Sequence, residues 1–221
     1  MRTYRPTRIL SELEAKELLS KWEIDFVDTR LAASEEEAVA IAGQLGYPVV
    51  LKIASPDITH KSDAGGVKLD LQTPQQVRES YASILSSARR ACPGAAIRGV
   101  SIQPMAPKGI ELIVGMSTDP TFGPMVMFGI GGIFVEILKD VAFRIVPLSE
   151  RDARTMVREI RGFPLLNGFR GQEPVDVPYL EGLLLRVSRL VEANPEIEEL
   201  DLNPLIAYAN GAVVLDARII L

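Results

Sequence analysis

Apolar residues recur at helical spacing in five stretches of the chain, and each stretch follows residues that favour a helix start. The clearest start is Ser11-Glu12-Leu13-Glu14, a capping box in which the serine and the second glutamate accept hydrogen bonds from backbone N–H groups. Another start has a proline, Pro74, at the first helical position. The five expected helices begin after Ser11, Ser34, Thr73, Ser149 and Asp176.

Short strands are predicted between these helices. Residues 48–54 form an apolar run between turn formers, which is typical of a buried strand, and residues 67–71 alternate apolar and polar side chains. Asn210-Gly211 separates two further apolar runs and indicates a hairpin. The remaining strand patterns cover residues 99–105, 109–115, 125–130, 134–138, 141–146, 206–208 and 213–215. Because the strands cluster in hairpins, we expect an α+β fold with antiparallel sheets.

A proline-containing bend between the strands at 99–105 and 109–115 is the best interior boundary. We expect an N-terminal lobe of residues 1–105 and a C-terminal lobe of residues 106–221. Each lobe then holds both helices and strands and can bury a core of its own.

Composition narrows the classes of function. The chain has 221 residues, of which 47% are apolar and 24% charged, as is typical of a globular protein. A net charge of −5 without a block of like charges gives no general attraction to nucleic acid or anionic lipid. The sequence shows no signal core and no apolar run of about 20 residues, so we expect a cytoplasmic protein. The single cysteine, Cys92, excludes an internal disulfide.

His60 is the only histidine, and it lies in Ile58-Thr59-His60-Lys61-Ser62-Asp63-Ala64-Gly65-Gly66. A neutral imidazole, whose ordinary pKa is about 6.5, can attack phosphorus at neutral pH, and the glycines let backbone N–H groups approach phosphate oxygens. His60 is therefore a candidate phosphoryl carrier. A lone histidine between lysine and aspartate is also typical of a solvated loop, and the pattern alone leaves both interpretations open.

Lys52 lies inside the apolar run 48–54. Because an ammonium group is costly to bury without an anion, this position predicts a carboxylate or a bound phosphate at the tip of the side chain. A lysine that extends to solvent along its methylene groups fits the pattern equally well.

The segment Gly129-Ile130-Gly131-Gly132 could let a nucleotide approach the backbone closely, although most glycine-rich turns serve only chain geometry. No Gly-Lys-Ser/Thr follows it, so it is not a Walker loop. The glycines lead into an apparent strand and not a helix, which excludes a dinucleotide fingerprint.

Near the C-terminus, alternation places Asp201 and Asn203 on one face of a strand, and Asp216 lies across the hairpin. Such hard oxygen donors suit Mg²⁺, which completes its shell with water and phosphate oxygens. The alternative is an exposed polar face of an edge hairpin, although leucines at 200, 202 and 205 favour a buried strand.

Together these motifs resemble the ATP-grasp, or beta, subunit of the ADP-forming acyl-CoA synthetases, of which acetate:CoA ligase is a familiar type. The similarity extends over essentially the whole chain. It is carried by residues 9–16, 46–52, the complete His60 loop and residues 119–124, 128–148, 165–171, 199–205 and 214–221. The resemblance implies an ATP-grasp fold whose two lobes clamp ATP or ADP.

The resemblance also implies which residues contact the nucleotide. Adenine would lie near the bend at 103–105, the phosphates would meet a lysine and an arginine under the glycine pair, and a glutamate would approach the ribose or the hinge. The candidate nucleotide ligands are Lys52, Gln103, Met105, Glu111, Gly131, Gly132 and Arg144.

Asn203 and Asp216 match the Mg²⁺ ligands of ATP-grasp proteins. Either Asp201 or Glu136 would support catalysis by orienting a phosphorylated His60, and the sequence leaves the choice between them open.

For His60 the resemblance implies a relay. Acyl-CoA and phosphate would react on a CoA-binding alpha subunit, whose own histidine passes the phosphoryl group to His60 and from there to Mg-bound ADP. The chain has no room for a CoA-binding domain, and it runs from a methionine near the first helix to the last strand. We therefore expect a separate subunit that works in a hetero-oligomer, a heterotetramer, with the alpha subunit.

Two alternative families compete with this resemblance. The beta subunit of succinyl-CoA synthetase shares the fold but carries an additional C-terminal domain and has no phosphorylatable histidine in such a loop. A grasp module that senses ATP without turning it over would not need His60.

Overall fold

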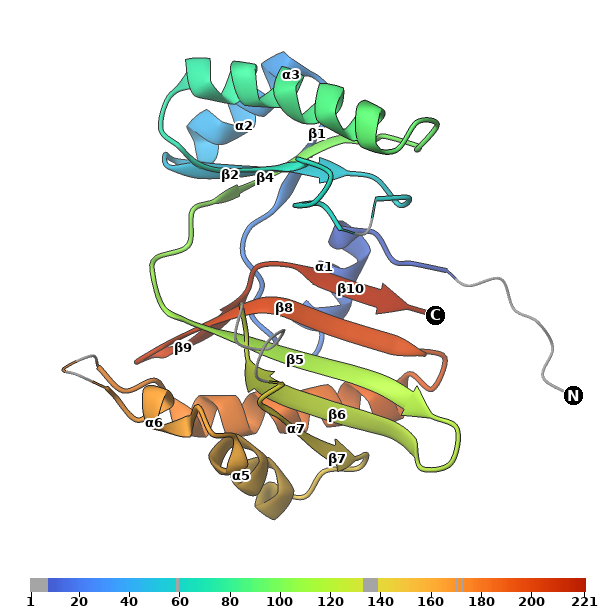
Figure 1. Cartoon of the computed structure of the whole chain (residues 1–221), viewed down its shortest axis with the longest axis vertical. Coiled ribbons are helices and arrows are strands. Elements are labelled where there is room, and N and C mark those ends of the chain that lie inside the picture. Colours follow the sequence, from blue (N-terminus) through green and yellow to red (C-terminus); the bar gives the residue numbers. More distant parts are fainter. Residues whose placement is uncertain (1–7, 59, 133–138, 170, 172) are drawn as a thin grey trace, which may run out of the picture. The chain divides into compact units, whose positions relative to one another are not determined.

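The computed structural model describes residues 8–58, 60–132, 139–169, 171 and 173–221. The chain divides into two compact units. The middle unit is Val27–Pro107, and the terminal unit combines the residues up to Phe26 with Lys108–Leu221. Each unit is a layer of helices on one face of an antiparallel sheet (Figure 1).

The middle unit has a four-stranded sheet in the order β1-β4-β2-β3, packed against two helices. Each helix has a side-chain cap at its N-terminus. Ser34 accepts a hydrogen bond from the N–H of Glu37 before α2, and Thr73 accepts one from the N–H of Gln76 before α3. The elements are β1 (Arg30–Ala32), α2 (Glu35–Leu45), β2 (Val49–Ala54), β3 (Val67–Leu71), α3 (Pro74–Ala91) and β4 (Gly99–Pro104).

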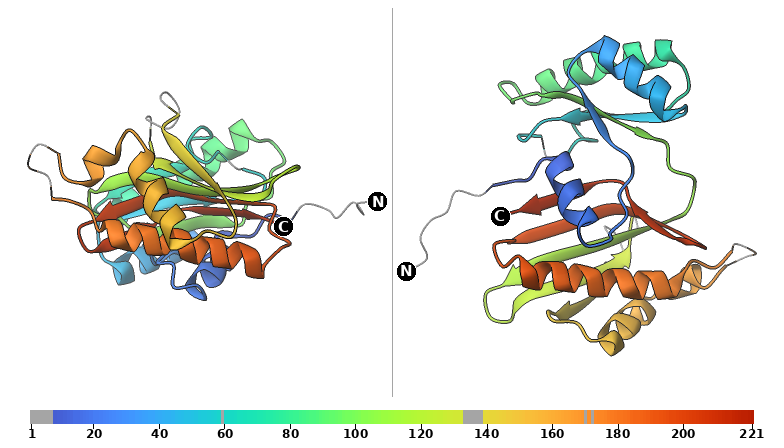
Figure 2. Two further views of the ribbon diagram at one scale, coloured as in Figure 1. Left: turned by 90° about the horizontal axis from the view of Figure 1, so that it is seen from below. Right: turned by 180° about the vertical axis from the view of Figure 1, so that it is seen from behind.

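The terminal unit has a sheet in the order β10-β8-β5-β6-β7, with β9 paired to β8. Seen from below in Figure 2, α5 and α7 lie across this sheet. The elements are α1 (Glu12–Ser20), β5 (Ile110–Asp119), β6 (Gly123–Ile130), β7 (Val141–Ile145), α5 (Glu150–Glu159), α6 (Phe163–Leu166), α7 (Val177–Ala193), β8 (Glu199–Tyr208), β9 (Gly211–Val214) and β10 (Ala217–Ile220).

The structure confirms the α+β class and the five expected helices. The C-terminal hairpin is confirmed as β8 and β9, but Tyr208 pairs with Gly211, so the turn is Ala209-Asn210, one position earlier than expected. The pattern did not predict β1 or β10. The expected strand at 134–138 lies outside the described residues.

The first helix belongs to a different unit from the one that we expected. We placed it in an N-terminal lobe ending at residue 105, but α1 packs against β10 in the terminal unit. Ala15 and Leu19 are fully buried there, in the core that also contains Ile219. The expected boundary at 105/106 lies close to the 107/108 boundary in the structure, so the difference concerns the residues up to Phe26.

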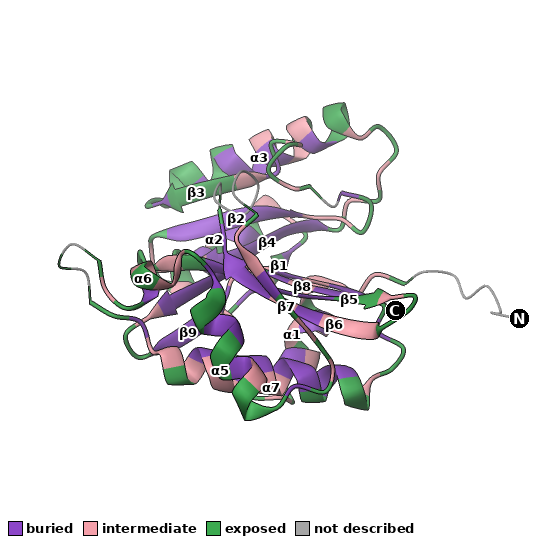
Figure 3. Cartoon of the chain, turned by 60° about the horizontal axis from the view of Figure 1, so that its bottom comes forward, coloured by how far each residue is buried: buried purple, intermediate pink, exposed green. Residues whose placement is uncertain are grey.

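Each sheet has one face in a core and one face outside it. Burial is concentrated on the strands and on the inner sides of the helices, while α3 and α5 expose their outer sides (Figure 3). In the middle unit, Leu51, Ile53 and Ile102 point into the core under α2 and α3. In the terminal unit, Leu200 and Leu202 point into the core with α1, α5 and α7. Because side chains alternate along a strand, the residues between them lie on the opposite face. None of the helices within the described ranges is both long and apolar enough to cross a membrane.

Leu19→Ala should destabilise the terminal unit by about 2–5 kcal/mol, because it removes a fully buried side chain from that core. Leu13→Ala on the same helix is the matched control, since Leu13 is 42% exposed and its loss should cost about 0.5 kcal/mol or less. Hydrogen exchange should become faster in β8 and β10 and stay unchanged in β2 and β4. Faster exchange in the middle unit alone would contradict the assignment of α1.

Candidate functional site

His60 lies at the exposed end of the loop that joins β2 to β3. The loop turns back on itself, because the N–H of Ala64 donates to the carbonyl of His60 at 3.3 Å and the N–H of Gly65 donates to that of Ser62 at 3.0 Å. Gly65 has a φ of +65°, a conformation that favours glycine. The local sequence therefore presents the imidazole on a compact, solvent-exposed turn.

Lys52 and Gln103 lie on the face of the middle sheet that points away from its core. Lys52 on β2 is paired with Ser101 on β4, and Val50 is paired with Gln103. Both polar side chains are buried, with exposures of 7% and 2%. Gln103 accepts a hydrogen bond from the hydroxyl of Thr29 at 3.4 Å. The structure thus places an ammonium group and an amide on one face of adjacent strands.

Met105 lies just beyond the end of β4, where its N–H donates to the carbonyl of Pro48 at 2.9 Å. The side chain is 37% exposed. The resemblance implies that adenine lies near this bend, and an exposed thioether close to Gln103 suits contact with a flat ring.

Glu111 and the glycine pair meet in the terminal unit. The N–H of Gly131 donates to the carbonyl of Glu111 at 2.8 Å. A Cβ atom on Gly132 would lie 2.8 Å from Oε2 of Glu111, and Gly132 has a φ of +63°. Only a glycine fits beside this carboxylate without rearrangement. The three predicted ligands are therefore brought together at one end of the sheet.

Asp201 on β8 lies on the sheet face opposite Leu200 and Leu202, paired with Gly115 and with Arg218. Burial raises the pKa of its carboxyl to about 6, and the charge of Glu199 adds to the shift while Arg218 opposes it. Its Oδ1 atom is buried and has no hydrogen-bond partner within the described part of the chain. An incompletely satisfied carboxylate of this kind can accept a proton or a hydrogen bond from a ligand.

Asn203 and Asp216 are brought together by the pairing of β8 with the residues before β10. The N–H of Asn203 donates to the carbonyl of Asp216 at 3.1 Å, and Oδ1 of Asp216 accepts from the N–H of Ala217 at 3.0 Å. In the described ranges, no group of three or more histidine, cysteine or acidic side chains could hold a metal. This donor set fits Mg²⁺, which needs only one or two protein oxygens beside water and phosphate.

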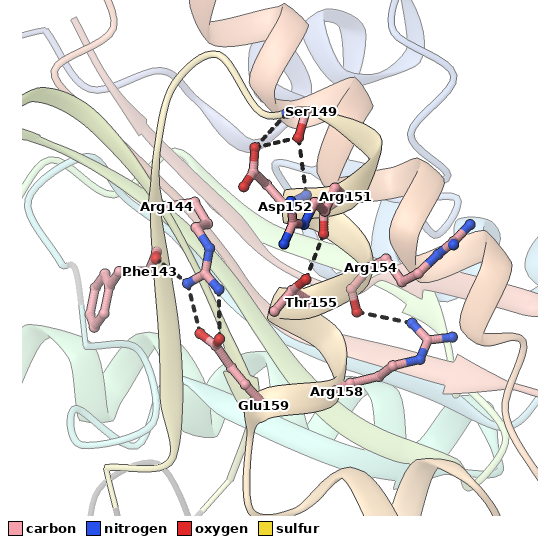
Figure 4. Close-up of polar contacts among 9 residues, drawn as sticks. All are labelled: Phe143, Arg144, Ser149, Arg151, Asp152, Arg154, Thr155, Arg158 and Glu159. Carbon is pink, nitrogen blue, oxygen red and sulfur yellow. Dashed lines mark hydrogen bonds and ion pairs between the residues drawn. The ribbon is translucent and has the colours of Figure 1, made fainter.

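Arg144 lies on the other face of the terminal sheet. It is paired across strands with Val126, which points into the core under α5 and α7. Its guanidinium group donates two hydrogen bonds, of 2.7 and 2.6 Å, to the carboxylate of Glu159 on α5 (Figure 4). Since Asp201 lies on the opposite face, the expected role of Arg144 as a phosphate ligand does not fit this geometry.

Three polar residues that lie beside the predicted site residues were not predicted from the sequence: Ser101, Glu199 and Arg218. Ser101 lies next to Lys52 and precedes Gln103 by two positions, so strict alternation along residues 99–104 could have indicated it. Arg218 bonds Glu199 at 3.2 Å beside Asp201, a contact set by the β8–β10 register, which the sequence did not reveal. Glu136, the other candidate for orienting a phosphorylated histidine, lies outside the described residues.

The comparisons with known proteins match nearly the whole chain. The family described as "ATP-grasp domain" matches residues 3–221. The acetate–CoA ligase [ADP-forming] I subunit beta of Pyrococcus furiosus is 50% identical over 97% of this chain and 92% of its own length.

Two solved structures of the dinucleotide-forming acetyl-coenzyme A synthetase 1 of Ca. Korarchaeum cryptofilum are also similar. The first, in complex with coenzyme A, Ca-AMPCP and HgCl⁺, is 51% identical, with a TM-score of 0.94 over 97% of this chain and 93% of that chain. The second, with coenzyme A and Mg-AMPPCP, is described with its phosphohistidine segment pointing towards the nucleotide binding site. It is 47% identical, with a TM-score of 0.83 over 96% of this chain and 92% of that chain.

Arg144→Met should lower stability by about 1 kcal/mol or less, because the pair with Glu159 is partly exposed, and should leave ATP affinity unchanged. The hydrogen bonds from Arg144 lower the pKa of Glu159 below its ordinary value of 4.5. The stabilisation is therefore present above pH 4.5 and is lost as the pH falls through the lowered pKa.

The midpoint temperatures of thermal unfolding of the wild-type and Arg144→Met proteins should therefore differ at pH 7. They should become equal as the pH falls below the lowered pKa of Glu159. A tenfold or larger loss of ATP affinity in Arg144→Met would show that the side chain binds nucleotide after all.

Proposed function

The chain belongs to the ATP-grasp domain family, and from that premise we propose that it is the nucleotide-binding beta subunit of an ADP-forming acyl-CoA synthetase. The overall reaction of such an enzyme converts acyl-CoA, ADP and phosphate into acid, ATP and CoA. One observation carries the proposal. The chain is 50% identical to an acetate–CoA ligase beta subunit, and its single histidine lies on an exposed turn. The same similarity over nearly the full length favours this reading over the succinyl-CoA synthetase and ATP-sensing alternatives.

His60 acts as a nucleophile and as a leaving group in turn. When ATP is consumed, an imidazole nitrogen forms a bond to the γ-phosphorus, and the bond between that phosphorus and the bridging oxygen of ADP breaks. In the opposite direction, a terminal oxygen of ADP attacks the phosphorus and the imidazole leaves. The exposed turn suits both steps, because the ring must meet two different partners.

Lys52 and Gln103 bind the nucleotide in the middle unit. Lys52 supplies a point charge to the phosphate oxygens, and burial of the side chain strengthens that attraction. Gln103 and Met105 lie along the same strand end and contact the base. Within the terminal unit, Glu111 and the glycine pair are the candidate nucleotide ligands.

Asn203 and Asp216 are the residues that would hold Mg²⁺. A bound metal would supply positive charge that offsets the charge on the phosphate oxygens during transfer. Asp201 is a candidate for orienting a phosphorylated His60, because its buried Oδ1 atom, which has no hydrogen-bond partner among the described residues, can accept a hydrogen bond from an imidazole N–H. Glu136 remains the alternative partner for this role.

The partner is a CoA-binding alpha subunit, which handles acyl-CoA, the acid and phosphate. The name of the Pyrococcus relative as a "subunit beta" supports a partner, and a heterotetramer remains our prediction for the assembly. A cytoplasmic location likewise stays a prediction from sequence.

His60→Ala should bind ATP normally but take up no phosphoryl group, because it lacks the only imidazole of the chain. The chain is incubated with γ-³²P-ATP and Mg²⁺, and acid-labile, base-stable label is counted, while calorimetry measures ATP binding. The wild-type chain should be labelled and the variant should not. Equal labelling of both would reject His60 as the carrier.

Lys52→Met should weaken ATP and ADP binding by about ten- to a hundredfold, since a hydrogen bond to a charged group contributes about 1.5–3 kcal/mol. Methionine keeps a similar length and apolar stem, so the sheet should remain intact. Lys68→Met is the matched control, because Lys68 is an exposed lysine on the neighbouring strand. Unchanged nucleotide affinity in Lys52→Met, measured by calorimetry, would mean that Lys52 only stabilises the fold.

A further inference from the structure

The turn that carries His60 is fixed at both of its ends. We call residues 60–65 the carrier segment. It is preceded by Asp57 and Ile58 and followed by Gly66.

The first fixed end is Asp57. Its Oδ2 atom accepts a hydrogen bond of 2.7 Å from the backbone N–H of Ala96, 39 residues further along the chain. A hydrogen bond to a carboxylate is about twice as strong as one between neutral groups. The N–H of Asp57 also donates to the hydroxyl of Ser55 at 3.2 Å, which holds the aspartate in its turn. Ile58, which is 4% exposed, packs in the core of the middle unit beside this contact.

The connection that contains Ala96 is joined to the sheet two residues further on. It lies between the end of α3 and the start of β4, where the N–H of Arg98 donates to the carbonyl of Ala54 at 2.8 Å. Asp57 therefore ties the entry to the carrier segment to the α3–β4 connection, which Arg98 in turn joins to β2.

The second fixed end is Gly66. The N–H of Ile53 donates to its carbonyl at 2.7 Å, and its own N–H donates to the carbonyl of Lys61 at 2.8 Å. A Cβ atom at this position would lie 2.5 Å from Cγ2 of Ile53, so only glycine fits. The exit of the segment is thus packed directly against β2.

The two ends restrain His60 unequally. Asp57 is three residues from His60, which allows a reach of about 11 Å in a fully extended chain, whereas Gly66 is six residues away and allows about 21 Å. On the entry side, the Asp57–Ala96 contact acts together with the burial of Ile58, two residues from His60, to limit where the imidazole can lie.

We propose that Asp57 is a positioning residue, which sets the place where His60 meets the phosphoryl group through its hydrogen bond to the N–H of Ala96. This inference rests on the proposed phosphoryl transfer by His60. In-line transfer requires the attacking nitrogen at about 3–3.5 Å from phosphorus, and a displacement of about 1 Å can cost a hundredfold in rate. Asp57 has no contact with the reacting atoms in this role.

The test compares Asp57→Ala with Asp57→Asn in the full chain. Alanine removes the acceptor for the N–H of Ala96, while the asparagine side chain keeps an oxygen acceptor at the same place. Glu79→Ala is the matched control, because Glu79 is an exposed acid of the same unit that bonds only a surface glutamine, Gln75, in a described contact. Rapid-quench labelling with γ-³²P-ATP measures the rate of His60 phosphorylation at saturating ATP, and calorimetry measures ATP affinity.

Asp57→Ala should phosphorylate roughly tenfold more slowly than the wild-type chain at saturating ATP, with ATP affinity unchanged. Asp57→Asn should recover most of the rate, and Glu79→Ala should match the wild type. Amide exchange at Ala96 should become faster in Asp57→Ala and stay close to wild type in Asp57→Asn.

Three results would overturn the inference. Wild-type rates in Asp57→Ala would show that the contact does not position His60. An equal loss of rate and ATP affinity in both Asp57 variants would indicate a general structural role. An unlabelled wild-type chain would refute the proposed function and remove the reaction that Asp57 is inferred to serve, and this outcome differs from the first two because it appears before any substitution.

Discussion

Alternation of side chains between the two faces of a strand is the constraint on which this molecule depends. In both units one face of the sheet is committed to a helix-covered core, so polar groups that alternate with core residues must gather on the other face. Lys52 alternates with Leu51 and Ile53, and Asp201 alternates with Leu200 and Leu202. The sequence that builds each core thereby also places the polar groups of the site.

Where a feature depends on local alternation or capping, the sequence predicts it well. The helix starts, the strand that holds Lys52 and the terminal hairpin all follow from short windows of sequence. The convergence of Asn203 with Asp216 was also foreseeable, because a tight hairpin and the short return to β10 leave few alternative registers.

Features set by distant contacts were not predictable in this way. We assigned α1 to the wrong lobe, because its buried face packs on β10, about 200 residues further along the chain. Arg144 illustrates a second limit: in Val141-Ala142-Phe143-Arg144-Ile145 both faces carry apolar residues, so alternation alone does not show which face points to the core. Only the register with Val126 and the contact with Glu159 show that Arg144 lies on the helix side.

His60 lies on an exposed turn between two strands of the middle sheet. A residue that carries a phosphoryl group must reach into solvent while its loop stays attached to the sheet. The most direct measurement of the central claim is isotope exchange between labelled ADP and unlabelled ATP, catalysed by the purified chain with Mg²⁺ and without acid, CoA or partner. Reversible transfer to His60 predicts that label appears in ATP and that phosphate is recovered on the imidazole. Tight binding of both nucleotides without any exchange would contradict it.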